Sequence, residues 1–385
     1  MASISSPASA DFYKSANRDR RVDALRGISI LLVLLLHFHL SYDLFRSPIG
    51  RILPGPYLSN VLWNGNYGVI IFFVISGYLI TSTSLRRFQS LGKISLRTFY
   101  AFRIARIYPC LLLVLAIVSA LSLAGIRSYQ NKNGVPLWLA DLSVLSFWHN
   151  VLMTKFGFFN YNLNVLWSLS VEEVFYLVFP LLCVFLRRAR WIVPVWVIAI
   201  VLGPIFRHAH PGNEILYLYS YPACFDSIAT GCCTALIAHK LRVGAQVRNV
   251  VQLIALSEMV WVFLRSNIAE ASVWGPTLMA LGASIFILAE GSFLQESHAP
   301  TAGRPSLSPV QWLGRHSYEL YLFHIVLLTG FRIVIGPTAI SPIFKLVWLV
   351  LFLVVTSAFS WFLSKYYSEP LNRWIRIKLT GRAVV

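Results

Sequence analysis

The sequence has unusually few charged residues. Only 12% of its 385 residues are charged, whereas a soluble domain carries roughly 25%. Among the charged residues the acidic ones are in the minority, with 15 Asp and Glu against 33 Lys and Arg. These numbers exclude a soluble globular fold, because the chain lacks the polar surface that water requires. Instead, 57% of the residues are hydrophobic.

Two further absences narrow the class of protein. The apolar residues fall in long runs, not in the short alternating segments of membrane barrel strands, so the pattern indicates helices. The five cysteines show neither metal-ligand nor disulfide-framework spacing. We interpret them as small packing residues, and we predict no metal site.

The apolar runs are long enough to cross a bilayer as helices, which takes about 20 residues each. The predicted fold is therefore an all-α polytopic bundle of about ten transmembrane helices. We expect them at 24–44, 66–84, 100–124, 166–186, 191–206, 220–240, 249–265, 273–292, 311–333 and 343–365. A further apolar stretch, 137–153, contains Asp141 and His149 and is predicted to be a re-entrant or interfacial piece on the outer side.

The basic residues fall mainly in alternate connections. With a cytoplasmic N-terminus, most of the 33 Lys and Arg lie on the cytoplasmic side, as the positive-inside rule requires. We therefore predict a cytoplasmic tail at 1–23, a transmembrane domain at 24–365 and a second cytoplasmic tail at 366–385. The formal charge of +18 is then a topology signal that also suits contact with anionic membrane lipid. We predict no nucleic-acid partner, and the oligomeric state cannot be read from the sequence.

Ionisable residues inside the predicted spans are the candidates for function, because each costs a few kcal/mol to insert into the bilayer. The informative ones are Arg26, His37, Glu172, Glu173, Asp226, Glu319 and His324.

Arg26 and His37 lie eleven residues apart on the first predicted helix. Eleven residues are about three turns, so both side chains project from one face, roughly 16 Å apart along the axis. A cavity beside this helix would therefore contain the Arg26 guanidinium and the His37 imidazole at two different positions along the helix axis. The structural alternative is an arginine that extends to the head groups and a histidine that is hydrogen-bonded within the bundle.

Arg103 and Arg106 lie three residues apart on the third predicted helix and share one face. Arginine binds phosphate through two parallel hydrogen bonds. Together with Arg26, these residues predict a cationic site for a phosphorylated ligand on the cytoplasmic side. The alternative is that they only anchor the helix end under the positive-inside rule.

The fourth predicted helix begins with the polar sequence WSLSVEEV. Glu172 or Glu173 suits a carboxylate that orients a histidine or accepts a hydrogen bond from a sugar hydroxyl. Trp167 and Ser170 are predicted to bind substrate beside it. The alternative is a helix N-terminus with acidic residues in its first turn.

Ser317, Tyr321 and His324 share a face of the ninth predicted helix, at positions i, i+4 and i+7. They predict a polar stripe in the interior, and we assign them to substrate binding. Spacing alone does not distinguish that role from the satisfaction of buried polar groups.

Taken in order, these motifs resemble the membrane-bound acyltransferase type 3 family. Each motif is weak alone, but six in sequence extend over nearly the whole chain. They are Arg26 and His37 with ten residues between, GxxGVxxFFxISGYLI at 65–80, RxxR at 103–106, WSLSVEEVFYLxFP at 167–180, GxxSYxLYLxH at 314–324 and YxxEPLNRW at 366–374.

The resemblance implies a bundle that moves an acyl group, usually acetyl, from cytoplasmic acyl-coenzyme A (acyl-CoA) to a carbohydrate hydroxyl at or beyond the far face. It also implies that Arg26 and His37 are the essential pair, followed by Arg103 and Arg106. Acyl-CoA, usually acetyl-CoA, is then a donor substrate, and no bound cofactor is expected. Some members carry an additional extracytoplasmic hydrolase-like domain. We expect this chain to act without one, which leaves open how transfer to a distant acceptor is completed.

The residues and the resemblance lead to one hypothesis. Arg26, Arg103 and Arg106 hold the CoA phosphates, the pantetheine arm follows the first helix, and His37 acts as general base or as nucleophile. The expected location is a bacterial plasma (inner) membrane. The main alternative is a transporter or glycan flippase, because polar residues in a helical bundle suit a transport path equally well.

Overall fold

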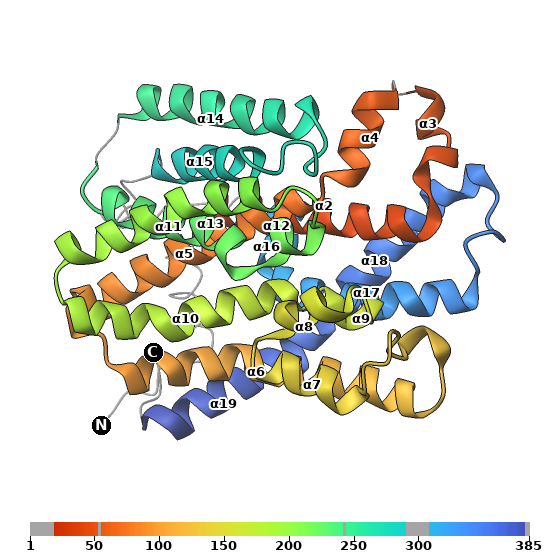
Figure 1. Cartoon of the computed structure of the whole chain (residues 1–385), viewed down its shortest axis with the longest axis horizontal. Coiled ribbons are helices and arrows are strands. Elements are labelled where there is room, and N and C mark those ends of the chain that lie inside the picture. Colours follow the sequence, from red (N-terminus) through yellow and green to blue (C-terminus); the bar gives the residue numbers. More distant parts are fainter. Residues whose placement is uncertain (1–18, 53–54, 242–243, 290–307, 382–385) are drawn as a thin grey trace, which may run out of the picture.

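The computed structural model describes residues 19–52, 55–241, 244–289 and 308–381 (Figure 1). The described residues form helices and contain no strand. The longer helices are α2 (Arg20–Tyr42), α5 (Asn66–Phe88), α6 (Leu96–Leu123), α10 (Trp167–Leu186), α11 (Ala189–Ala209), α13 (Tyr221–Ala238), α14 (Ala245–Arg265), α15 (Gly275–Leu288), α17 (Ser317–Val334) and α18 (Lys345–Leu363). The shorter α-helices are α3 (Ile49–Ile52), α4 (Gly55–Trp63), α7 (Leu137–Leu145), α8 (His149–Phe156), α9 (Tyr161–Asn164), α12 (Glu214–Tyr219), α16 (Pro309–Arg315) and α19 (Glu369–Thr380). Single turns are η1 (Leu44–Arg46), η2 (Leu91–Lys93), η3 (Arg127–Tyr129), η4 (Pro342–Phe344) and the π-helical η5 (Ser364–Ser368).

The protein is a multi-pass helical membrane bundle, as predicted. Within the described ranges, eight helical segments are long and apolar enough to cross a membrane. Each of the ten predicted segments coincides with helix in the structure. Two of them, α13 and α15, are not among the eight membrane-crossing segments. Residues 1–18 and 382–385 of the predicted tails, and 290–292 of the eighth predicted helix, lie outside the described residues.

One predicted helix is two helices in the structure. The segment 311–333 divides at His316 into α16 and α17, so the prediction of a single continuous helix was wrong there. A Cβ at Gly314 would lie 1.8 Å from the carbonyl oxygen of Asp23, which means that α16 touches the backbone of α2. An ion pair of 3.3 Å between Arg315 and Asp23 holds α16 in this position, and α17 begins only beyond it.

The apolar stretch 137–153 forms α7 and part of α8. These helices have 9 and 8 residues, too few for either to cross a bilayer, in line with the predicted re-entrant or interfacial piece. Figure 1 shows that α3 and α4 lie towards one end of the long axis of the bundle. α19 lies towards the other end.

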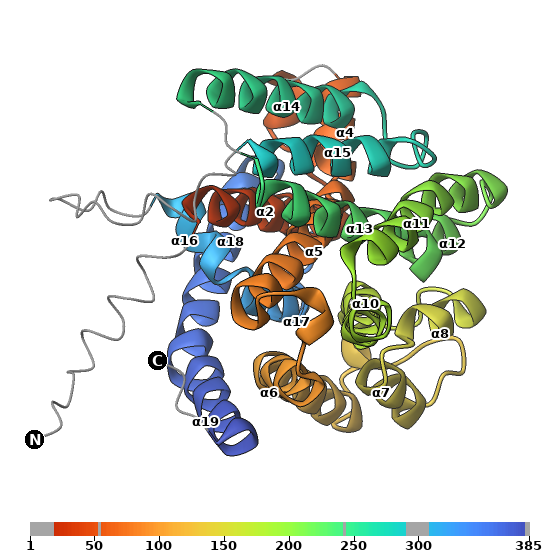
Figure 2. The ribbon, with the colours of Figure 1, turned by 90° about the vertical axis from the view of Figure 1, so that its left-hand side faces the viewer.

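α5 and α13 pack closely against each other in the interior. A Cβ at Gly77 would lie 1.9 Å from the carbonyl oxygen of Ile228, and one at Gly231 would lie 2.0 Å from that of Val74. Only glycine permits such an approach of two backbones. Figure 2 shows α5, α10, α13 and α17 in the interior, with α7, α11, α14 and α19 outside them.

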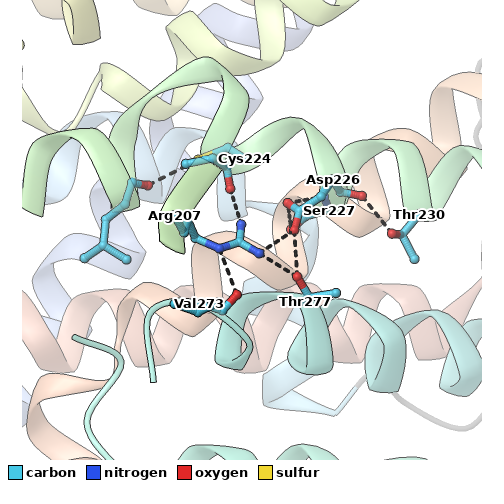
Figure 3. A network of polar contacts seen from close by, with 9 residues as sticks. Arg207, Cys224, Asp226, Ser227, Thr230, Val273 and Thr277 are labelled. Carbon is cyan, nitrogen blue, oxygen red and sulfur yellow. Dashed lines mark hydrogen bonds and ion pairs between the residues drawn. The ribbon is translucent and has the colours of Figure 1, made fainter. Parts of the chain in front are cut away.

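Asp226 has a structural role. Its carboxylate accepts a hydrogen bond from the Arg207 guanidinium at 2.8 Å and one from the Thr277 hydroxyl at 2.9 Å. Both charged side chains are almost fully buried. Arg207 also donates to the carbonyl groups of Val273 and Ala223 (Figure 3). This network joins α11, α13 and α15.

Candidate active site

A cavity of about 350 Å³, which we call the arginine cavity, contains five arginine side chains. They are Arg26 on α2, Arg87 on α5, Arg103 and Arg106 on α6, and Arg376 on α19. The fold brings them together because α19 returns to pack against α6. Figures 1 and 2 both show these two helices side by side.

The lining of the arginine cavity holds more basic than acidic side chains. Its two carboxyl groups belong to Asp19 and Asp23, and Asp23 is ion-paired with Arg315, which does not line the cavity. Asp19 caps α2 by accepting a hydrogen bond from the backbone N–H of Arg21 at 2.9 Å. Burial raises the pKa of the Asp19 carboxyl above its ordinary value. The cavity therefore favours an anionic ligand, and its guanidinium groups suit phosphate.

A second cavity, of about 140 Å³, adjoins the first, and we call it the central cavity. Arg26, Arg103 and Arg106 line both cavities. Arg26 donates two hydrogen bonds to the Ser317 hydroxyl, at 3.1 and 2.9 Å, which connects α2 to α17. Glu172 also lines the central cavity, where it interacts electrostatically with all three arginines. Arg26 therefore has both the Glu172 carboxylate and the Ser317 hydroxyl near its guanidinium group.

Tyr321 lies between the central cavity and a third cavity, because its side chain lines both. Its hydroxyl accepts a hydrogen bond from Ser168 at 2.7 Å and donates one to the carbonyl group of Val165 at 2.9 Å. These two bonds hold the ring between α10 and α17. Val69 of α5 is also shared by the two cavities, so the side chains of Tyr321 and Val69 form the boundary between them.

The third cavity, of about 450 Å³, contains His37, and we call it the histidine cavity. Trp167 also lines it, with its ring centroid 4.7 Å from that of Tyr219. The remaining polar and aromatic wall includes Trp63, Asn66, Tyr161, Asn164, Glu214 and Asn267. Arg26 and His37 therefore line two adjoining cavities on one side of α2, not a single shared one.

His37 is in contact with a second histidine. Its Nδ1 lies 2.9 Å from the carbonyl oxygen of Val33 and 3.3 Å from Nε2 of His324. Nδ1 of His324 lies 2.7 Å from the carbonyl oxygen of Tyr321. A carbonyl can only accept a hydrogen bond, so Nδ1 carries the proton in both rings. The lone pair of His324 then faces the N–H of His37, and Nε2 of His37 is left as its basic atom.

The remaining predicted residues take other positions. Neither Glu172 nor Glu173 orients the His37 ring: in the described part of the chain, its polar contacts are Val33 and His324. Glu173 is buried near Arg103, and its Oε1 has no hydrogen-bond partner among the described residues. Ser170 is buried and donates to the backbone carbonyl group of Leu166, the residue that precedes α10. His324 lies behind His37 and lines none of the three cavities described above.

Sequence reasoning missed several residues of the site. The positive-inside pattern accounts for Arg87 and Arg376 only as basic residues on the cytoplasmic side, but both line the arginine cavity. Tyr219, whose ring packs on that of Trp167, also lines the histidine cavity. No local pattern indicates Arg376, which comes from a helix far along the chain. Glu319 belongs outside the site, because it accepts a hydrogen bond from Ser368 at 2.8 Å and links α17 to η5.

The fold and the three adjoining cavities define a polytopic membrane protein with five arginines around one cavity and a histidine pair beside another. A family model described as an acyltransferase domain matches residues 19–365. The chain belongs to this acyltransferase family.

Similar proteins come from Staphylococcus aureus. A protein of strain COL that is provisionally named an O-acetyltransferase is 25% identical over 337 residues, covering 82% of this chain and 52% of its own length. O-acetyltransferase OatA of strain NCTC 8325 is 25% identical over 321 residues, covering 79% of this chain and 49% of its own length. This chain thus spans about half the length of the curated relatives that it matches. No solved structure matches it significantly.

Proposed function

We propose that this protein is an O-acyltransferase, with acetyl as the group transferred, that uses acyl-CoA and a carbohydrate hydroxyl. The observation that carries the proposal is the order of the cavities. The arginine cavity adjoins the central cavity at Arg26, Arg103 and Arg106, and the central cavity adjoins the histidine cavity at Tyr321 and Val69. An extended donor with phosphates at one end and a thioester at the other fits this order.

The donor binds from the arginine side. Arg26, Arg103 and Arg106 hold its phosphates through charge-assisted hydrogen bonds. The pantetheine arm passes through the central cavity along α2, over the roughly 16 Å that separate Arg26 from His37. The arginine side faces the cytoplasm, where acyl-CoA is found, and the membrane is a bacterial plasma (inner) membrane.

His37 performs the chemistry. Its Nε2 accepts the proton of the acceptor hydroxyl as the hydroxyl oxygen attacks the thioester carbonyl carbon. The carbon–sulfur bond breaks, and the leaving CoA thiolate takes the proton from the imidazolium. An alternative route has Nε2 attack the thioester carbonyl carbon and expel the CoA thiolate, so that an acyl-imidazole forms. The acceptor hydroxyl then attacks this acyl group, the imidazole leaves, and the hydroxyl proton passes to the thiolate.

The histidine cavity holds the acceptor. Trp167 and Tyr219 provide apolar ring surface, and Asn66, Asn164 and Glu214 provide hydrogen-bonding groups around it. A sugar presents both apolar C–H faces and hydroxyl groups, so this mixed wall suits a carbohydrate of a surface or exported glycan.

The test is acetyl-CoA turnover by the purified full chain in lipid nanodiscs, followed as free thiol. We expect thiol release that a suitable glycan acceptor accelerates and that His37→Ala abolishes. A transporter or flippase would move its substrate without any release of thiol. In cells, deletion of the gene followed by mass spectrometry of surface glycans would identify the acceptor by the acetyl increment that disappears.

A further inference from the structure

Two arginines of the arginine cavity form a separate group around one ring. The guanidinium carbon of Arg87 lies 3.8 Å from the centroid of Phe102, and that of Arg376 lies 4.6 Å from the same centroid. Phe102 is on α6, Arg87 is near the end of α5, and Arg376 is on α19. Three helices therefore place two like charges next to one aromatic ring, which stabilises each of them through a cation–π contact.

The pair lies in a strongly cationic environment. Arg376 interacts electrostatically with Arg106, Arg87 and Arg103, and all of these interactions are repulsive. The Nε atom of Arg376 is buried, and none of the described residues accepts a hydrogen bond from it. A doubly charged phosphate between the two guanidinium groups would relieve the repulsion and satisfy this donor.

The position of the pair along the cavities indicates which phosphate it binds. Arg26, Arg103 and Arg106 line both the arginine and the central cavity, whereas Arg87 and Arg376 line the arginine cavity alone. In CoA, the diphosphate directly follows the pantetheine arm, and the 3′-phosphate of the ribose lies beyond it. The chemical order of the donor thus matches the order of the arginines.

We propose that Arg87 and Arg376 form the subsite for the 3′-phosphate of CoA, and that the other three arginines hold the diphosphate. The inference rests on the proposed function, because it takes acyl-CoA as the donor. It goes beyond the family match, which covers residues 19–365 and so does not include Arg376. The subsite makes the protein selective for CoA over 3′-dephospho-CoA.

The test measures the dissociation constants of CoA and of 3′-dephospho-CoA for the purified full chain in nanodiscs. We expect the unaltered protein to bind CoA at least about tenfold more tightly, as expected for one well-held phosphate. Arg376→Gln should bring the ratio of the two constants close to one, mainly by weakening CoA. Arg87→Gln is an independent second variant on a different helix and should have the same effect.

Two controls separate the subsite from general electrostatics. Arg103→Gln should weaken both ligands by a similar factor and keep their ratio. Lys378→Gln, which removes an exposed charge two residues from Arg376, should change neither constant. A ratio that stays the same in both Arg376→Gln and Arg87→Gln would overturn the subsite and leave the donor proposal standing. Failure of the unaltered protein to bind either ligand would instead overturn the donor proposal and, with it, the subsite.

Discussion

Nε2 of His324 lies 3.3 Å from Nδ1 of His37. Because His324 donates its own Nδ1 proton to the carbonyl group of Tyr321 at 2.7 Å, it presents a lone pair to His37. The partner of the His37 imidazole is therefore a neutral ring and not a carboxylate. His324 accepts the N–H of His37, which also contacts the Val33 carbonyl oxygen, without adding a charge to the interior of the membrane, where a charge would be costly.

Removing the ring of His324 should lower turnover without weakening the donor. We expect His324→Phe to reduce kcat by about a hundredfold, because the His37 ring is no longer held as a base. The KM for acetyl-CoA should change little, since the arginines that bind its phosphates are untouched. Thiol release at varied donor concentration measures both quantities.

The conservative variant distinguishes positioning from packing. His324→Gln keeps a hydrogen-bond acceptor on a side chain of related size, so it should recover much of the lost kcat. Equal activity of the Gln and Phe variants would show that His324 only fills space.

Enlarging Tyr321 should block the path between the central and histidine cavities. Tyr321→Trp places a larger ring at the boundary that both cavities share. We expect kcat to fall at least about tenfold while the dissociation constant for CoA stays the same, because the thioester no longer reaches His37. Tyr321→Phe keeps the ring size and should retain most of the activity. Full turnover by the Trp variant would mean that the donor takes another route.

Breaking the buried ion pair of Arg207 and Asp226 should destabilise the protein. Asp226→Ala leaves the Arg207 guanidinium buried without its carboxylate, at a cost of about 3–5 kcal/mol. A large fall in the melting temperature of the purified protein is expected. The double variant Arg207→Met with Asp226→Leu removes both charges and should regain part of that loss. An unchanged melting temperature in Asp226→Ala would contradict the structural role of the network.

The stability of the protein should fall as the solution is acidified, and His149 contributes to this. Burial lowers the pKa of His149 from 6.5 to about 3. Between these values, the unfolded chain binds a proton that the folded chain excludes, so stability is complete above about pH 6.5 and decreases towards pH 3. Melting temperatures of the unaltered protein from pH 7 to pH 5 should therefore decrease.

His149→Asn removes the titrating ring, while its amide still reaches towards Ser143, which contacts the His149 ring at 2.8 Å. We expect a smaller decrease of the melting temperature over the same pH range. A pH dependence as steep as that of the unaltered protein would show that His149 is not responsible.

Much of the fold could be predicted because apolar runs and basic flanks are local features of the sequence. The spacing of Arg26 and His37 correctly indicated one side of one helix, since the pitch of a helix is fixed. The division of 311–333 could not be predicted, because it depends on the contact of Gly314 with α2, which the sequence alone does not contain. The position of Arg376 in the arginine cavity could not be predicted either, because it depends on how α19 packs against α6.

The assignment of the His37 partner was wrong for a related reason. Two adjacent carboxylates in a span, such as Glu172 and Glu173, are unusual and indicate function, but they do not indicate which side chain they contact. The distance from α10 to the His37 ring depends on how α2, α10 and α17 pack, and α17 supplies His324 instead. Glu172 turns towards the arginines of the central cavity.

The most direct test of the central claim is acetyl-CoA turnover by His37→Ala and by Arg103→Gln in the same nanodisc preparation. The account predicts that His37→Ala binds CoA normally and releases no thiol. It predicts that Arg103→Gln raises the KM for acetyl-CoA and keeps a measurable kcat. Normal thiol release by His37→Ala would contradict the account, because the imidazole at the end of the path would then have no part in the reaction.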